Sequence, residues 1–251
     1  MSDRPTTIVF ANQKGGAGKS TSLILTASFF YFKQDAAVFV IDADYPQHSV
    51  KGLRDSEIRA LKEDDQFGRQ FLKYGKTDEA GKQTIYPVLP SPMQNVFSRV
   101  DPEKASAFEV ACVPKFNTEY VLIDTPGSLA VDGIADVLLS VDKIVIPLEP
   151  EQMSLASAVQ FVAAITKLIE QTGASTEIIA LWNKIRIQSH ADIMTSQSEY
   201  FRSRNVRVLD SYIPESVTLK RSETRSTVLP INISSLALTP FMEELTTALK
   251  Q

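Results

Sequence analysis

Short apolar runs alternate with longer stretches of helical periodicity along the whole chain. This alternation predicts an α/β fold with a mostly parallel, twisted sheet and helices on both faces, because parallel strands need a crossover between them. Near-continuous runs of Val, Ile and Leu are also typical of strands that are buried on both faces. The predicted strands are Thr7–Ala11, Ala37–Ile41, Thr84–Leu89, Tyr120–Ile123, Lys143–Leu148, Glu177–Trp182 and Arg207–Ile213.

The segments between and after these strands predict helices, and no Pro-, Gly- or Ser-rich linker divides the chain. Residues 1–251 are therefore expected to form a single domain. The first strand begins by about Thr6, so we expect no N-terminal helix-turn-helix before it. The stretch Lys73–Gln83 predicts an exposed loop, because it combines two glycines with mixed charges. The predicted helices are Lys19–Lys33, Ser56–Tyr74, Pro102–Cys112, Val131–Leu139, Ser154–Thr172, Ala191–Arg204 and Ser234–Lys250.

The composition is that of an ordinary soluble protein, with 43% hydrophobic and 22% charged residues among 251. Cys112 is the single cysteine, which excludes a disulfide framework or a multi-cysteine metal cluster within one chain. Its apolar neighbours predict a small core residue rather than a reactive thiol. No basic and apolar leader occurs, and no run approaches the length of a membrane span, so a cytoplasmic location is expected.

The segment Lys14-Gly15-Gly16-Ala17-Gly18-Lys19-Ser20 lies between the first predicted strand and the first predicted helix. Its glycines allow positive φ angles and a close approach of the backbone to a polyphosphate, and the helix N-terminus faces the anion. Lys19 can reach the β- and γ-phosphates, and the Ser20 hydroxyl can bind Mg²⁺. The order of strand, loop and helix predicts a P-loop NTPase rather than a glycine-rich turn without a ligand. The predicted nucleotide-binding residues here are Gly15, Gly16, Ala17, Gly18, Lys19, Ser20 and Thr21.

Lys14 precedes the glycines, at a position that the general phosphate-binding loop does not require to be basic. From the residues alone, it is either a solvated charge or an additional phosphate ligand. With this lysine the segment resembles the deviant Walker A motif, KGG-x-GK-[S/T], of the ParA, Soj and MinD ATPases. The resemblance implies an enzyme that hydrolyses ATP with Mg²⁺ and forms a homodimer in its ATP state. It also implies that Lys14 reaches the γ-phosphate bound to the other protomer.

Two acidic residues, Asp42 and Asp44, follow the second predicted strand. Doubly wound sheets bind their ligands at the carboxyl ends of such strands, so one acid can support Mg²⁺ while the other orients water. The family has D-x-D-P-Q at this place, which implies that Asp44 acts in hydrolysis and that Asp42 supports the metal. This chain departs from the motif because Tyr45 is inserted before Pro46, and the insertion puts the position of Gln47 in doubt.

Asp124 ends another apolar run, Val121-Leu122-Ile123, and continues into Thr125-Pro126-Gly127. An acid at the end of an apolar strand is typical of a Walker B site, where it reaches Mg²⁺. Because this pattern follows the phosphate loop and the two acids after the second strand along the chain, it favours a metal site with Ser20, Asp42 and Asp124. The predicted catalytic residues are Lys14, Lys19, Asp44 and Asp124.

Two residues directly after the last two predicted strands are candidates for binding the base of the nucleotide. Asn183 follows a predicted strand, and an amide can pair with the donor and acceptor edges of adenine. Pro214 follows the last predicted strand. The resemblance implies adenine contacts for both residues, whereas an ordinary strand-end turn is the alternative for Asn183.

The net charge of −4 is unevenly distributed along the chain. From Lys184 to Arg225 eight basic residues face five acidic ones, so the region carries a charge of +3. This excess suggests an anionic partner, although a solvated face would have the same composition. Short partition ATPases bind DNA non-specifically through their C-terminal region, which implies DNA contacts for Lys220, Arg221 and Arg225.

Among relatives, the resemblance favours short ParA-type partition ATPases. Iron–sulfur members would need paired cysteines, and the acidic C-terminal helix, with Glu243 and Glu244, argues against membrane binding. The variant Asp44-Tyr45-Pro46-Gln47 also resembles ParA-like proteins of conjugative transposons. We therefore expect an ATP-dependent switch in DNA partition or in the maintenance of a mobile element, with a ParB-like stimulating protein. The alternatives are a small-molecule ligase of the dethiobiotin-synthetase-like class and an ATPase that positions a protein complex without binding DNA.

Overall fold

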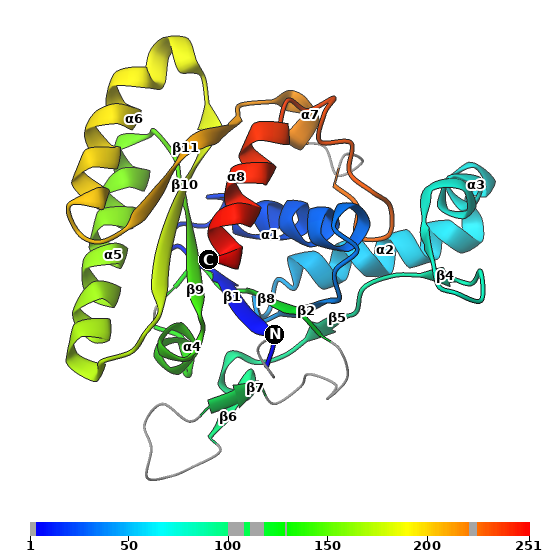
Figure 1. The fold of residues 1–251 in the computed structure, drawn as a ribbon, viewed down its shortest axis with the longest axis horizontal. Helices are drawn as coiled ribbons and strands as arrows, with labels where there is room; N and C mark the ends of the chain where they lie inside the picture. Colours follow the sequence, from blue (N-terminus) through cyan, green and yellow to red (C-terminus); the bar gives the residue numbers. More distant parts are fainter. Residues whose placement is uncertain (1–3, 100–107, 111–117, 129, 221–224) are drawn as a thin grey trace.

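The fold is centred on a seven-stranded parallel sheet (Figure 1). The computed structural model describes residues 4–99, 108–110, 118–128, 130–220 and 225–251. The strand order is β11-β10-β9-β1-β8-β2-β5, and every pair in this sheet is parallel. The strands are β1 (Thr6–Phe10), β2 (Val38–Asp42), β5 (Val88–Pro90), β8 (Tyr120–Asp124), β9 (Lys143–Leu148), β10 (Glu177–Ile185) and β11 (Arg207–Pro214).

Helices cover both faces of this sheet, as the sequence predicts (Figure 1). Helices α1, α2 and α8 pack on one face, and α4, α5 and α6 pack on the other. Side chains alternate between the two core layers along each strand; in β1, for example, Ile8 and Phe10 face the first layer and Val9 the second. The helices are α1 (Lys19–Ser28), α2 (Ser49–Glu63), α3 (Asp65–Tyr74), α4 (Ile134–Ser140), α5 (Gln152–Thr172), α6 (Ile187–Arg202), α7 (Val217–Lys220) and α8 (Thr239–Lys250).

The predicted helix over 56–74 is in fact two helices, α2 and α3, separated at Asp64. Asp64 has an extended backbone, and its carboxylate accepts hydrogen bonds from the amides of Gln66 and Phe67 over 2.8 and 3.0 Å. An aspartate in this position caps the helix that follows it. The helical periodicity is continuous across the break, so only the cap could have revealed it.

Other boundaries also differ from the prediction. The expected helix over 102–112 is wrong at Phe108–Val110, which is strand β7 and pairs with β6 (Phe97–Arg99). The rest of that helix, with Cys112, lies outside the described residues. The expected loop over 73–83 contains β3 (Lys76–Thr77), which pairs with β4 (Gln83–Thr84), so the expected strand over 84–89 divides into β4 and β5.

Helix boundaries at the two ends of the chain shift as well. The helix expected to end at Lys33 is α-helical to Ser28 and continues as a π-helical turn over Phe29–Lys33. The last helix begins at Thr239 rather than Ser234, with a proline in its first turn, where a missing amide donor has no cost.

Helix α5 is, by length and composition, apolar enough to cross a membrane, contrary to the expectation that no run approaches that length. Leu155, Phe161 and Ile165 of this helix are buried in the core on the sheet. The core helix of a globular domain has the same length and hydropathy, and the packing of α5 is of that kind.

A buried polar network joins α2 to the segment after α7. Arg54 donates from Nε to the Thr227 hydroxyl over 2.7 Å and from Nη2 to the Thr227 carbonyl over 2.8 Å. Its Nη1 donates to the carbonyl of Tyr86 over 2.7 Å. Glu57 accepts from the amide and hydroxyl of Thr227 and from the hydroxyl of Ser226. The network therefore holds residues 226–227 against α2.

We expect Glu57→Ala to lower the free energy of unfolding by about 2–4 kcal/mol, because it leaves three buried donors without an acceptor. Urea unfolding measures the change. Glu63→Ala, at the exposed end of the same helix, is the matched control and should change stability by less than about 0.5 kcal/mol. Equal shifts for the two variants would contradict a stabilising role of the network.

Candidate functional site

The loop between β1 and α1 has the backbone of a phosphate-binding loop. Gly16 and Gly18 have φ angles of 75° and 99°, a region that residues with a side chain rarely adopt. A Cβ atom on Gly18 would overlap Nδ2 of Asn183, so this position also requires a glycine for space. Asn183 Nδ2 in turn donates to the carbonyl of Ala17 over 2.9 Å. The end of β10 thus holds the loop in place.

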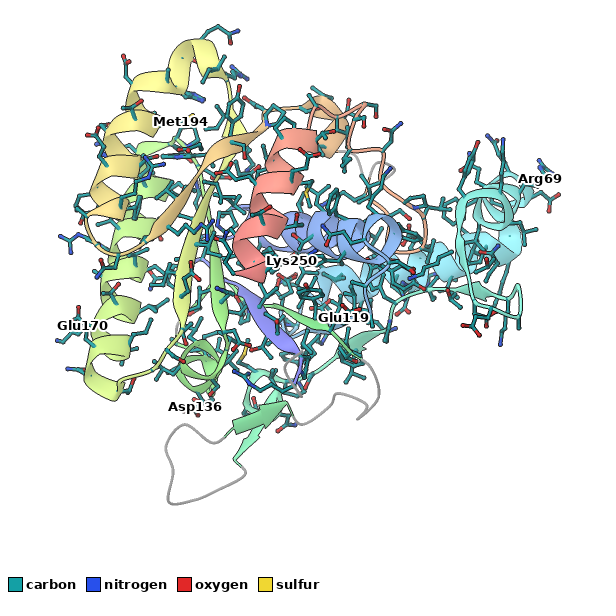
Figure 2. All side chains as sticks on the ribbon, viewed as in Figure 1. Arg69, Glu119, Asp136, Glu170, Met194 and Lys250 are labelled. Atoms are coloured by element: carbon teal, nitrogen blue, oxygen red, sulfur yellow. The ribbon has the colours of Figure 1, made fainter. Side chains whose placement is uncertain are left out.

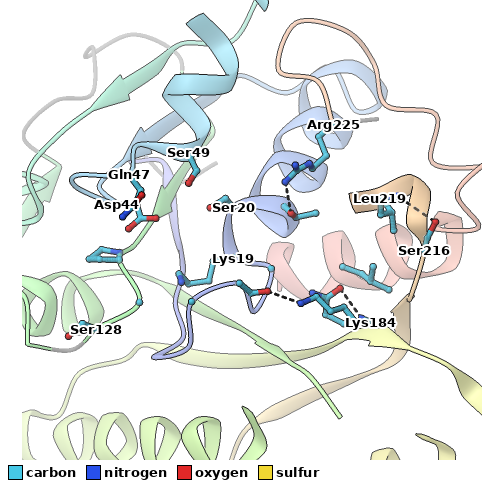
Figure 3. Close-up of a pocket in the computed structure, with 18 of the residues that line it drawn as sticks. Lys19, Ser20, Asp44, Gln47, Ser49, Ser128, Lys184, Ser216, Leu219 and Arg225 are labelled. Carbon is cyan, nitrogen blue, oxygen red and sulfur yellow. Dashed lines mark hydrogen bonds between the residues drawn. The ribbon is translucent and has the colours of Figure 1, made fainter. Parts of the chain in front are cut away.

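A cavity of about 760 Å³ lies beside this loop, at the carboxyl ends of the strands (Figure 3). Its lining includes the loop itself, residues 44–47 after β2, residues 126–128 after β8, the end of β10, the end of β11 and Arg225. Doubly wound sheets bind nucleotides in this location. The predicted site residues that line it are Gly15, Gly16, Gly18, Lys19, Ser20, Thr21, Asp44, Asn183, Pro214 and Arg225.

Ser20 and Asp124 meet at the floor of the site. The Ser20 hydroxyl donates to Oδ2 of Asp124 over 2.5 Å. Asp124 is fully buried, and its Oδ1 has no hydrogen-bond partner in the described part of the chain. Burial raises the pKa of Asp124 to about 7, against the opposing effect of the Ser20 hydrogen bond. A buried carboxylate oxygen without a partner, next to a hydroxyl, fits a cation such as Mg²⁺.

Asp42 is paired with Asp124 across the β2–β8 register and is also fully buried. Its two oxygens accept hydrogen bonds from the amides of Lys51, over 2.8 Å, and Asp44, over 3.3 Å. The carboxylate therefore holds the loop after β2 and the first turn of α2, next to Nδ1 of His48 at 3.6 Å.

Asp44 is half-buried and lines the cavity, close to Gln47 (Figure 3). Burial raises its pKa above the ordinary value, while the charge of Lys19 lowers it. The inserted Tyr45 is 70% exposed, so the loop accommodates the extra residue by turning its ring toward solvent. Gln47 stays within the lining of the cavity despite the insertion.

Lys14 lies apart from the other loop residues, because its ammonium is held by two carboxylates. Nζ pairs with Glu149 at 3.3 Å and with Glu151, from the turn between β9 and α5. The hydrogen bond to Glu151 keeps the pKa of Lys14 above its ordinary value. Glu149, which is buried, also pairs with Lys184, and Lys184 donates to the carbonyl of Gly16 over 2.9 Å.

Sequence reasoning missed these partners and part of the cavity wall. Glu149, Glu151 and Lys184 were visible only as polar residues after apolar strands, which is a weak signal. Ser216 and Leu219, which also line the cavity, have no motif of their own.

Of the three predicted DNA contacts, Lys220 and Arg225 lie among the described residues. Lys220 ends helix α7, and Arg221 lies outside the described residues. Arg225 lines the cavity and donates from Nη1 to the Thr21 hydroxyl over 3.2 Å.

Several cations of the basic region are already paired within the fold. Arg186 pairs with Glu215 at 2.5 Å, and Arg202 with Asp210 at 2.6 Å. Surface pairs of this kind contribute little to stability, so their cations can exchange partners. Both acids lie within residues 184–225 and are already counted there, so these pairs leave the +3 excess of the region unchanged.

The geometry of the phosphate loop and the cavity agrees with the similarity of this chain to a known protein family. The sequence profile of the family described as the CobQ/CobB/MinD/ParA nucleotide binding domain matches residues 8–229. The chain therefore belongs to this family, as the resemblance to ParA and MinD implied. A comparison with curated proteins gave no match.

Solved structures show the same fold at low sequence identity. A plasmid partition protein from Borrelia burgdorferi B31, bound to AMPPNP, is 21% identical, with 96% of this chain and 99% of that chain covered and a TM-score of 0.60. Cyanothece McdA is 18% identical, with 98% of both chains covered and a TM-score of 0.61. Cobyrinic acid a,c-diamide synthase from Mycobacterium smegmatis, with bound ADP and magnesium, is 19% identical, with 87% and 89% covered and a TM-score of 0.55.

The site fits the ligand that family membership implies. The chain is an ATPase of the ParA and MinD type that uses ATP and Mg²⁺. The described residues contain no cluster of three or more His, Cys, Asp or Glu side chains that could hold a metal alone. Such a sparse protein shell suits Mg²⁺, which keeps several waters and completes its octahedron with phosphate oxygens.

Burial of Asp124 makes the stability of the metal-free protein depend on pH. Asp124 titrates near 3.8 when unfolded and near 7 when folded, so between these values the folded state holds one more proton. Stability should therefore fall as the pH rises toward 7, by about 1.4 kcal/mol per pH unit from this group, and level off above it.

Urea unfolding in EDTA at pH 5, 6 and 7 measures this slope. Asp124→Asn should remove that contribution, whereas Asp136→Asn, the same change on the exposed side of α4 (Figure 2), should leave it in place. Equal slopes for wild type and Asp124→Asn would contradict the raised pKa.

Proposed function

We propose that this protein is a Mg-ATP-dependent dimerising switch of the ParA type that acts in DNA partition or in the maintenance or transfer of a plasmid or conjugative element. The observation that carries the proposal is the position of Lys14. Its ammonium is bound to Glu149 and Glu151 rather than directed into the cavity that the other loop residues line. This conformation directs Lys14 away from the cavity of its own protomer, which supports a role at a phosphate bound to the other protomer.

In this proposal each predicted site residue has one role. Lys19 binds the phosphates, and Ser20 and Asp124 hold Mg²⁺, with Asp42 fixing the adjacent loop. Asp44 orients the attacking water, because it lines the cavity beside Lys19. Asn183 and Pro214 contact the base from the ends of β10 and β11, where both residues line the cavity.

The proposed partners are a second copy of the chain, non-specific DNA and a ParB-like stimulating protein, in the cytoplasm and without membrane binding. The basic region from 184 to 225 supports DNA as the anionic partner, and a dimer would double it. Doubling the number of phosphate contacts steepens both the affinity and its dependence on salt, because each contact releases counterions.

ATP-dependent DNA binding tests this proposal. We expect wild type to bind an arbitrary duplex with ATP but not with ADP or without nucleotide, and to release it as salt rises. Asp44→Ala should strengthen binding with ATP, because hydrolysis no longer resets the switch. Lys14→Ala should lose it, because the dimer does not form. Electrophoretic mobility shifts at several salt concentrations measure all three.

Two results would contradict the proposal. Binding that is independent of nucleotide would remove the switch, and an absence of binding in every state would move the search to a protein cargo. ATP turnover that depends on a small carboxylate, rather than on DNA, would instead favour the ligase class.

We also expect Lys220→Ala combined with Arg221→Ala to weaken DNA binding while ATP turnover without DNA stays at the wild-type level. The slope of log affinity against log salt should become shallower by about 1 for each DNA phosphate that the variant no longer neutralises. Arg69→Ala with Lys73→Ala removes the same charge from α3, which extends away from the body of the molecule (Figure 2), and is the matched control. Equal DNA affinities for the two double variants would contradict the assignment.

A further inference from the structure

Arg225 stands at the wall of the nucleotide cavity (Figure 3). We infer that its guanidinium binds the α-phosphate of the nucleotide, rather than DNA. The inference depends on the ATP site and not on the dimerisation or DNA binding proposed above.

The guanidinium of Arg225 lacks a carboxylate partner among the described residues. Its Nη1 donates to the neutral hydroxyl of Thr21, and its Nε is buried without a hydrogen-bond partner in the same part of the chain. A guanidinium that is partly removed from water and not compensated by an acid favours an anionic ligand. The guanidinium of Arg54 on α2 differs from that of Arg225, because each of its three nitrogens donates a hydrogen bond to another residue of the fold.

The position of Thr21 indicates which phosphate Arg225 would meet. Ser20 and Thr21 are consecutive in the first turn of α1, so their side chains diverge by about 100° around the helix axis. Ser20 turns toward Asp124 and the metal end of the cavity, whereas Thr21 turns toward Arg225. The guanidinium therefore lies away from the Mg²⁺ and γ-phosphate end.

The opposite wall of the cavity restricts the assignment further. Ser216 and Leu219 lie on the far side from Asp44 and Gln47, with Arg225 between the two groups (Figure 3). The base is expected on that far side, next to Pro214. A cation between the metal end and the base end is placed for the first phosphate, and a planar fork of donors suits two of its oxygens.

The residues that follow Arg225 fix the position of the chain at this wall of the cavity. Ser226 and Thr227, the next two residues, are fixed to α2 by the Arg54–Glu57 network. The chain directly after Arg225 is therefore fixed before a ligand binds, which lowers the entropic cost of exchanging the Thr21 hydroxyl for a phosphate oxygen. A DNA backbone, by contrast, would have to enter the cavity to reach the same guanidinium.

Titration of wild type and Arg225→Ala with ATP and with ADP, in Mg²⁺ and by calorimetry, tests the inference. Both affinities should fall by the same factor, about ten- to hundredfold, because the α-phosphate is common to the two nucleotides. Arg225→Lys keeps the charge but not the fork, so its loss should be intermediate. Arg69→Ala on α3 is the control for the loss of one positive charge, and its affinities should equal those of wild type.

Thermal unfolding without nucleotide checks that each variant is folded. A folded Arg225→Ala variant with wild-type affinity for both nucleotides and weakened DNA binding would overturn the inference and make Arg225 a DNA contact. A lower affinity for ATP with an unchanged affinity for ADP would also overturn the inference, since the guanidinium would then contact the γ-phosphate.

Discussion

The parallel pairing of β8 with β1 on one side and with β2 on the other is the constraint on which the site depends. The register aligns Asp124 with Phe10 in the first pair and with Asp42 in the second, so the three strands end at one level. The chain that leaves β1 then forms the phosphate loop directly above this level and brings Ser20 to 2.5 Å from Asp124. A slip of one residue in either pair would turn its side chains to the opposite face and separate the two acids from the loop.

Local signals made most of this arrangement predictable from sequence. The strands β1, β2, β8 and β9 are continuous apolar runs, and the phosphate loop and the two terminal acids have fixed places next to them. What could not be predicted depends on residues far apart in sequence or on single caps. The break at Asp64 arises from one carboxylate that caps α3, and the strand at Phe108–Val110 exists only because it pairs with β6. The position of Arg225 at the cavity was not predictable either, because composition cannot report that the next two residues, Ser226 and Thr227, are bound to α2.

Glu149 determines what the release of Lys14 from its ion pairs would cost. The carboxylate is buried and pairs with two lysines, Lys14 and Lys184, of which Lys184 also donates to Gly16 of the loop. Removing one partner of an isolated buried ion pair leaves a buried charge without compensation and destabilises the protein. Here Lys184 remains when Lys14 leaves, so the buried carboxylate keeps a cation. The departure of Lys14 therefore costs less than the rupture of an isolated pair, while the loop stays tethered.

Helix α2 connects the two sides of the cavity mechanically. Its first turn is fixed by Asp42, directly after the loop that carries Asp44, and its middle carries the network that holds residues 226–227 behind Arg225. The loop that carries Asp44 and the segment that follows Arg225 are thus attached to one helix. Close packing leaves a buried helix little internal freedom, so these contacts fix the two walls of the cavity relative to one another. The shape of the cavity between Asp44 and Arg225 therefore depends on the packing of α2 as well as on the sheet.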